Sequence, residues 1–131
     1  LREMSMELPV PGILESPFGV FESKIFSYKK QKIEEKKYTK WFDYDKIKNS
    51  PCVRTRRQGD YLTVNSEGGR KKLNRIFIDE KIPAEMRDRL PVVAAGSEIL
   101  WIPGGRMNEK YKITSTTGRV LELHYQGGAL A

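Results

Sequence analysis

The apolar residues of this chain come in short runs separated by turn-forming residues, and this pattern constrains the fold more than any other feature. The turn signal Ser16-Pro-Phe-Gly19 precedes a run of β-branched and aromatic residues, which predicts a β-hairpin over residues 13–28. A second hairpin is predicted at residues 91–102, where Gly96-Ser97 separates two apolar runs. Further short strands are predicted at residues 38–44, 52–56, 111–114 and 119–125.

Two short helices are predicted among these strands. Leu73, Ile76 and Phe77 follow the i, i+3, i+4 spacing of an amphipathic helix over residues 71–79. Pro83 suits the first position of a second helix over residues 84–90. The expected fold class is therefore α+β, built from antiparallel β hairpins with two short helices inserted in the C-terminal half.

The break Asn49-Ser-Pro51 is the strongest internal boundary. It predicts a β-rich lead-in or linker segment over residues 1–50, a domain over residues 51–126 and a frayed tail over residues 127–131. Within the lead-in, residues 1–12 are expected to be irregular, and the mixed-charge run at residues 29–37 is expected to be a mobile loop. The first residue is Leu1 and not Met, so we expect a fragment of a longer protein.

Positive charge is concentrated in the middle of the chain. The formal net charge is +7, and residues 54–89, with ten basic and six acidic side chains, contribute +4 of it. Such a surface favours a polyanionic partner such as nucleic acid, although a solvated basic face is the alternative. No apolar run approaches the roughly 20 residues that span a membrane. The single Cys52 cannot form an internal disulfide, which favours a reducing cytoplasm.

The residues of a self-sufficient catalytic centre are not found in the sequence. His124 fits a surface or half-buried position in an alternating strand better than a general base, and one His with one Cys cannot build a tetrahedral zinc site. The Gly-Gly-Arg turns at residues 68–70 and 104–106 either receive a phosphate or simply provide positive φ, and the second interpretation is favoured. Three aromatic residues are candidates for base stacking or for the core: Trp101, Tyr111 and Tyr125.

An ordered set of motifs between about Val53 and Tyr125 resembles the C-terminal domain of bacterial tRNA(Ile)-lysidine synthetase. The motifs are Arg54-Thr-Arg-Arg-Gln-Gly-Asp60, Lys71-Lys-Leu73, Phe77-Ile-Asp-Glu-Lys-Ile-Pro83, Arg87-Asp-Arg-Leu-Pro-Val-Val93, Glu98-Ile-Leu-Trp-Ile-Pro-Gly104 and Tyr111-Lys-Ile-Thr114. The segment Trp41-Phe-Asp-Tyr-Asp-Lys-Ile47 is similar to the phrase that precedes this domain in the longer enzymes.

The resemblance implies a parent ligase that adenylates the wobble cytidine of tRNA(Ile) with ATP and Mg and then attaches lysine. Catalysis in that family lies in an N-terminal domain with a Ser-Gly-Gly-x-Asp-Ser loop, which this sequence lacks. The fragment alone is then expected to be inactive, to hold no cofactor and to bind tRNA(Ile), on the acceptor-stem side. Asp60 and Asp79 are expected to fix the arginines and turns. The expected RNA-binding residues are Arg54, Arg56, Arg57, Lys71, Lys72, Arg75, Lys81, Arg87 and Arg106.

Two alternatives remain open at this stage. In the first, the basic face docks on the N-terminal catalytic domain of the same chain and stabilises it without contacting tRNA. In the second, the chain is an independent small enzyme, which no catalytic constellation supports. No membrane partner is expected, and a homodimer is left open.

Overall fold

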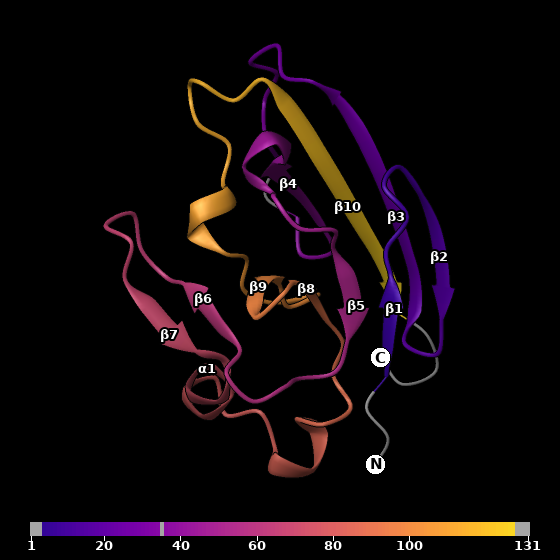
Figure 1. Cartoon of the computed structure of the whole chain (residues 1–131), viewed down its shortest axis with the longest axis vertical. Helices are drawn as coiled ribbons and strands as arrows, with labels where there is room; N and C mark the ends of the chain where they lie inside the picture. Colours follow the sequence, from indigo (N-terminus) through magenta and orange to yellow (C-terminus); the bar gives the residue numbers. More distant parts are fainter. Residues whose placement is uncertain (1–3, 35, 128–131) are drawn as a thin grey trace.

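The computed structural model describes residues 4–34 and 36–127, which form two β-sheets (Figure 1). Sheet A has six strands in the order β1-β5-β8-β9-β6-β7, and sheet B has four in the order β2-β3-β10-β4. All pairings are antiparallel except a single parallel bridge between β6 and β9. The strands are β1 (Ser5–Glu7), β2 (Gly12–Ser16), β3 (Gly19–Ser27), β4 (Thr39–Asp43), β5 (Cys52–Arg54), β6 (Tyr61–Thr63), β7 (Arg70–Lys72), β8 (Val92–Ala95), β9 (Glu98–Trp101) and β10 (Arg119–Gly127).

Sheet B is organised around the long strand β10. The predicted hairpin at residues 13–28 is confirmed as β2 and β3, and β10 pairs with β3 along nine residues, from Arg119 opposite Ser27 to Gly127 opposite Gly19. Its other edge pairs with β4. Because side chains alternate along a strand, Leu121 and Leu123 point inward from β10 and are fully buried.

Sheet A lies between two apolar clusters. On the side of sheet B, Trp101 and Leu100 pack with Phe21, Phe42 and Leu121 in a core shared by both sheets. On the other side, the helix α1 (Leu73–Asp79) packs its buried residues Leu73, Ile76 and Phe77 against Leu62, Val92 and Ile99. The predicted apolar stripe of this helix is confirmed. Figure 1 shows α1 on the side of sheet A that is remote from sheet B.

Three local predictions differ from the structure. Residues 70–72 pair with β6 as strand β7, so α1 begins at Leu73 and not at residue 71. The second helix is only a 3₁₀ turn, η2 (Ala84–Met86). Residues 111–114 are not a strand, because the buried Asn108 accepts a hydrogen bond from the Lys110 amide and starts another 3₁₀ turn, η3 (Glu109–Tyr111). The expected α+β class and the antiparallel hairpins are nevertheless confirmed.

Strands from both halves of the chain contribute to both sheets. Strand β1, which lies in the predicted irregular lead-in, pairs with β5 in sheet A, and β10 pairs with β3 and β4 in sheet B. The boundary near residue 50 stays a prediction, as does the tail, of which residues 128–131 lie outside the described residues. No helix in the described ranges is long and apolar enough to cross a membrane.

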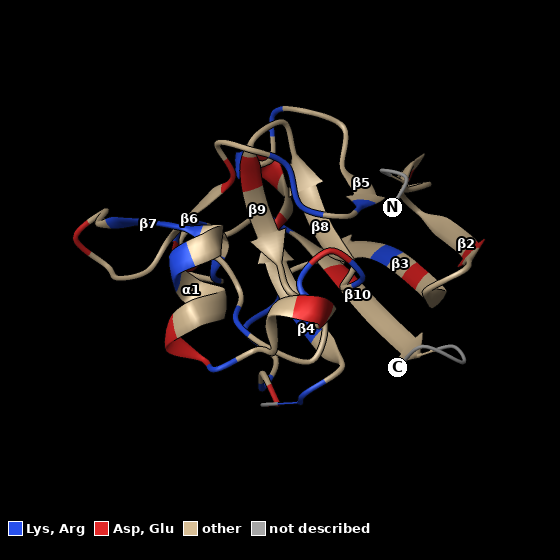
Figure 2. Cartoon of the chain, turned by 90° about the horizontal axis from the view of Figure 1, so that it is seen from below, with Lys and Arg blue, Asp and Glu red and all other residues tan. Residues whose placement is uncertain are grey.

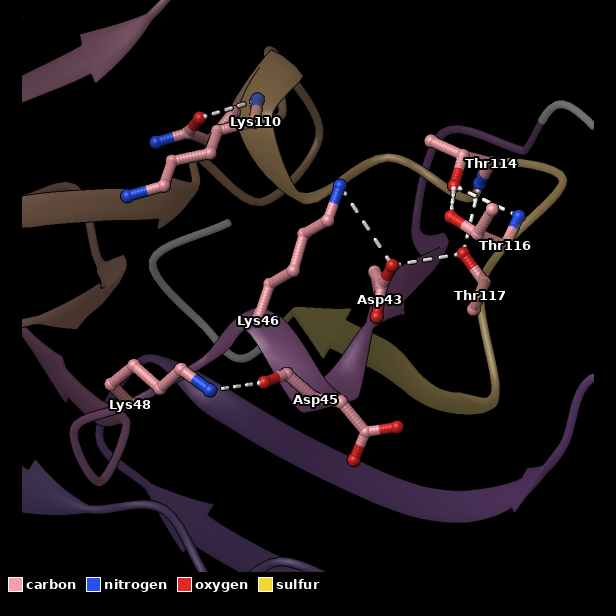
Figure 3. Close-up of polar contacts among 9 residues, drawn as sticks. Asp43, Asp45, Lys46, Lys48, Lys110, Thr114, Thr116 and Thr117 are labelled. Carbon is pink, nitrogen blue, oxygen red and sulfur yellow. Dashed lines mark hydrogen bonds and ion pairs between the residues drawn. The ribbon is translucent and has the colours of Figure 1, made fainter.

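A buried carboxylate ties β4 to the turn that precedes β10. Asp43, 4% exposed, accepts a hydrogen bond of 2.9 Å from Thr117 Oγ1 (Figure 3). Lys46 Nζ, in the 3₁₀ turn η1 (Tyr44–Lys46), lies 3.9 Å from the same oxygen. Next to this site Arg119 pairs with Asp45, and its hydrogen bond lowers the pKa of the Asp45 carboxyl. The Thr117–Asp43 hydrogen bond and the Arg119–Asp45 pair both fix the start of β10 against the end of β4.

Candidate nucleic-acid interface

Arg54, at the end of β5, lies inside the protein and not on its surface. Its side chain is 1% exposed, and it donates two hydrogen bonds of 2.8 Å to the two carboxylate oxygens of Asp60. It also donates to the backbone oxygens of Gly96 and Thr55. Burial alone would lower the pKa of Arg54, but the hydrogen bonds and charge of Asp60 outweigh it and raise the pKa. Arg54 therefore holds the β5–β6 loop against the β8–β9 turn, and Asp60 anchors it as predicted.

Arg56, two residues later, reaches the surface beside α1. Its Nε donates to Asp88 Oδ1 at 2.8 Å, and its Nη1 donates to Asn74 Oδ1 at 3.0 Å. The side chain keeps 25% of its surface exposed, and that of Asp88 keeps 53%. The hydrogen bond from Arg56 lowers the pKa of the Asp88 carboxyl. Arg56 is thus held in one orientation at the surface while part of its side chain stays accessible.

Strand β7 sends its neighbouring lysines to opposite faces of sheet A. Lys71 lies opposite Leu62, on the side of α1, and forms an ion pair with Asp79. Arg75 Nε lies 3.1 Å from the same carboxylate, and the hydrogen bond from Lys71 is the main cause of the lowered pKa of Asp79. Lys72 lies opposite Tyr61, on the face of sheet A that is turned away from α1. The predicted role of Asp79 in fixing basic neighbours is confirmed.

Two further predicted residues lie where α1 ends. Lys81 is exposed and has a φ of 57°, a left-handed conformation in the turn that stops the helix. Arg87 is half-buried, and its Nε donates to the backbone oxygen of Ile82 at 2.9 Å. We call the basic residues on and around this helix the α1 surface, which comprises Arg56, Lys71, Arg75, Lys81 and Arg87. Figure 2 shows one basic and one acidic segment on α1 itself.

The remaining predicted residues lie outside the α1 surface. Arg57 is exposed in the loop between β5 and β6. Arg106 lies in the loop after β9, where it lines a groove with β4 residues of sheet B, on the opposite side of sheet A from α1. Arg70, which the sequence analysis placed in a turn and did not count among the RNA-binding residues, has its guanidinium 4.7 Å from the centre of the Tyr61 ring. The signal for this interaction was missed because β6 and β7 were not recognised as strands.

The other candidates of the sequence analysis are structural. Trp101, Tyr111 and Tyr125 are 0%, 3% and 6% exposed, so they belong to the core and cannot stack on bases. His124 is an exposed strand residue whose Nδ1 lies 2.7 Å from Thr39 Oγ1. Gly68 has a φ of 86°, as its interpretation as a turn glycine required. In the described ranges no group of His, Cys, Asp and Glu side chains is arranged to hold a metal ion.

Comparison with known proteins gives a consistent result. A family model described as the TilS substrate C-terminal domain matches residues 52–123. The tRNA(Ile)-lysidine synthase of Caldanaerobacter subterraneus subsp. tengcongensis is 41% identical over 120 residues, which cover 90% of this chain and 26% of that protein. The enzyme of the same name from Geobacillus kaustophilus is 38% identical over 123 residues, which cover 92% of this chain and again 26% of that protein.

A solved structure supports the same relationship. The structure described as "Crystal structure of TILS C-terminal domain" superposes with a TM-score of 0.79 at 33% identity, covering 96% of this chain and 98% of the other. The chain spans about a quarter of the length of the curated relatives it matches. The motifs, the two-sheet fold and these matches agree, and the chain belongs to the family of TilS substrate C-terminal domains.

Proposed function

We propose that this domain binds and positions tRNA(Ile), on the acceptor-stem side, for a catalytic domain of the same protein. In this proposal the parent is a tRNA(Ile)-lysidine synthase, which is the name its relatives carry. We further propose that it acts in the cytoplasm. Its N-terminal domain uses ATP and Mg to ligate lysine to the wobble cytidine. The domain described here contributes no cofactor and no catalytic residue, and is inactive alone.

The α1 surface is the observation that carries the proposal. A double-stranded RNA stem is recognised mainly through its shape, phosphates and 2′-hydroxyls, for which Arg and Lys are the suitable partners. Arg56 is already oriented by Asp88 and Asn74, so less side-chain freedom is lost when it binds a phosphate. Arg75, 66% exposed, lies on the same helix as Asn74 and extends this surface.

The structure divides the proposed RNA-binding residues into two groups. Arg56, Lys71, Arg75, Lys81 and Arg87 form the principal group on the α1 surface, and Arg57 lies on the exposed loop after β5. Lys72 and Arg106 face the other side of sheet A and would meet a different part of the RNA. We leave Arg54 out of the interface, because a guanidinium that is 1% exposed cannot reach a phosphate in the folded domain.

A salt titration of tRNA(Ile) binding tests this proposal. We expect log affinity to fall linearly with log salt, and the double variant R56Q/R75Q to reduce the slope by roughly 0.7–0.9 for each phosphate that is no longer neutralised. K24Q/K29Q, which also removes two positive charges, is the matched control, because Lys24 on β3 and Lys29 after it are exposed bases. If both variants reduce the slope equally, the α1 surface contributes only general electrostatic attraction. An affinity that does not change with salt would contradict RNA binding through phosphates.

Docking on the catalytic domain is the second candidate, and one observation favours it. Ile78, on α1 among the basic residues, is 49% exposed, which suits a protein interface better than a phosphate backbone. Under this alternative, R56Q/R75Q and I78S leave tRNA binding by the isolated chain unchanged. They lower the thermal stability of the full-length protein instead.

A further inference from the structure

A groove runs along β4, remote from the α1 surface. Its volume is about 520 Å³, within the range of roughly 300–1,000 Å³ that is typical of small-ligand sites. One wall comes from β4 and the loop before it, with Lys40, Trp41 and Ile33. The opposite wall comes from residues 105–113, where Met107 and Ile113 provide apolar surface and Arg106 and Lys112 provide charge.

The wall that carries Arg106 is held by a tight loop. Ile102 donates its amide to Arg106 O at 2.9 Å, and Gly105 donates to Ile102 O at 2.7 Å. Gly104 has a φ of 81°, and a Cβ there would lie 3.0 Å from the Tyr38 ring, so only glycine fits this loop. The loop is thereby packed against the segment leading into β4, and its Arg106 lines the same groove as Trp41.

The Trp41 indole is held in a fixed orientation. Its Nε1 donates to Glu122 Oε2 at 3.1 Å, and its ring meets the Phe26 ring edge-on at a centroid distance of 5.1 Å. The side chain is nevertheless only half-buried, and it lines the groove. An aromatic ring that is fixed and partly accessible is the type of surface on which nucleic-acid bases stack.

Of the basic residues that line the groove, Lys40 and Lys112 have interactions of their own, which leaves Arg106 as its available cation. Lys112 lies 2.6 Å from Glu109, and Glu34 lies 3.4 Å from Lys36, so both acidic residues of the groove have basic partners. In the part of the chain that the structure describes, the Arg106 guanidinium makes no hydrogen bond or ion pair. An exposed guanidinium and an indole that line the same groove match a ligand that combines a phosphate with a flat ring.

We propose that this groove binds one unpaired nucleotide of an RNA strand, with the base against Trp41 and the phosphate on Arg106. This inference rests on the proposed RNA-binding function and adds a second kind of recognition to it. A paired stem presents its phosphates and 2′-hydroxyls outward, whereas only an unstacked base can enter a groove and lie on an indole. The groove is therefore assigned to a single-stranded part of the RNA and the α1 surface to a paired part.

Amide and indole NMR spectra of this chain test the inference, because its two tryptophans act as internal reporters. Titration with a single-stranded RNA pentamer is expected to shift the Trp41 indole signal and to leave that of the buried Trp101 in place. R106Q is expected to weaken pentamer binding several-fold, and W41L roughly tenfold, in line with the loss of one base–aromatic stack. R106Q removes a side chain without partners in the described structure, so it remains informative if W41L does not fold.

A blunt RNA duplex and AMP separate this inference from the proposed function. R56Q/R75Q is expected to weaken duplex binding and to preserve the Trp41 shift with the pentamer. R106Q is expected to preserve duplex binding and to weaken the pentamer binding that causes the Trp41 shift. If the duplex binds but the pentamer leaves the Trp41 signal unmoved, the groove assignment is overturned and the proposed function stands. If AMP binds the groove more tightly than the pentamer, a free nucleotide is the ligand and the assignment to an RNA strand is also overturned.

Discussion

The pairs Arg54–Asp60 and Arg56–Asp88 use the same residue types, begin two residues apart and share a hydrogen-bond length of 2.8 Å, yet they serve different purposes. The first pair has side chains that are 1% and 2% exposed, and the second has side chains that are 25% and 53% exposed. A buried pair has lost its hydration and depends on its partners, whereas an exposed pair competes with water and salt. The hydrogen-bond length does not separate the structural arginine from the available one; burial does, together with the bidentate contact and the two backbone acceptors that, of the two, only Arg54 has among the described residues.

Removal of Asp60 is expected to have the largest effect. D60A leaves the Arg54 charge buried without its carboxylate, and breaking such a pair costs about 3–5 kcal/mol of unfolding free energy. Urea denaturation of the variant measures the loss. The double variant R54M/D60L should recover most of it, because no unpaired charge remains. A loss in D60A no larger than that in D88N would show that the two pairs do not differ as proposed.

Asp43 is a buried carboxylate that has no bidentate arginine partner among the described residues, so it extends the comparison of buried and exposed groups. T117V removes the hydroxyl that donates to the buried Asp43 and accepts from the Thr114 amide, so both groups lose this partner (Figure 3). We expect a loss of about 1–3 kcal/mol in the free energy of unfolding, chiefly from the buried carboxylate that loses its donor. The control T116V changes an exposed threonine in the same turn and should have little effect on the denaturation midpoint.

The surface pair is expected to contribute little to stability. D88N removes the charge that orients Arg56, but both groups are solvated and exposed ion pairs add little. The urea midpoint should therefore match that of the unmodified chain within error. Binding of tRNA should instead show a weaker dependence on Arg56, so R56Q costs less affinity in the D88N background. A clear drop in the urea midpoint of D88N would show that the Arg56–Asp88 pair stabilises the fold, as the Arg54–Asp60 pair is expected to do.

The smallest expected effect concerns pH. Arg119, Lys71 and Arg56 hold the pKa values of Asp45, Asp79 and Asp88 below the ordinary value of 3.8. A carboxylate with a lowered folded-state pKa stabilises the fold above its unfolded pKa, and this stabilisation is lost as pH falls through the folded value. Stability should therefore decline below about pH 4, less steeply in D45N/D79N/D88N. Because these carboxylates are solvated, added salt should reduce the difference between the proteins, and a difference that persists in high salt would contradict surface pairing.

Local periodicity was sufficient for the elements that carry their own pattern. The stripe Leu73, Ile76 and Phe77 predicted α1, and the Gly96-Ser97 turn predicted the β8–β9 hairpin. Strands without apolar alternation were missed: β7 consists of Arg70, Lys71 and Lys72 and exists only because β6 lies beside it. The prediction of the candidate site was limited in the same way. The motif Arg54-Thr-Arg-Arg-Gln-Gly-Asp60 contains several arginines, but nothing in it indicates which of them is buried.

The sequence by itself determined the family, the α+β class and the concentration of basic residues around α1, since each depends on the order of residues along the chain. Only the tertiary structure decided which arginine is buried, that Lys71 and Lys72 face opposite ways, and that Arg106 and Trp41 line the same groove. These outcomes depend on interactions between residues distant in sequence, such as the pairing of β4 with β10. The burial of a side chain and the face of the sheet to which it points depend on how the layers pack. A sequence predicts them only where its apolar residues recur with the period of a helix or strand.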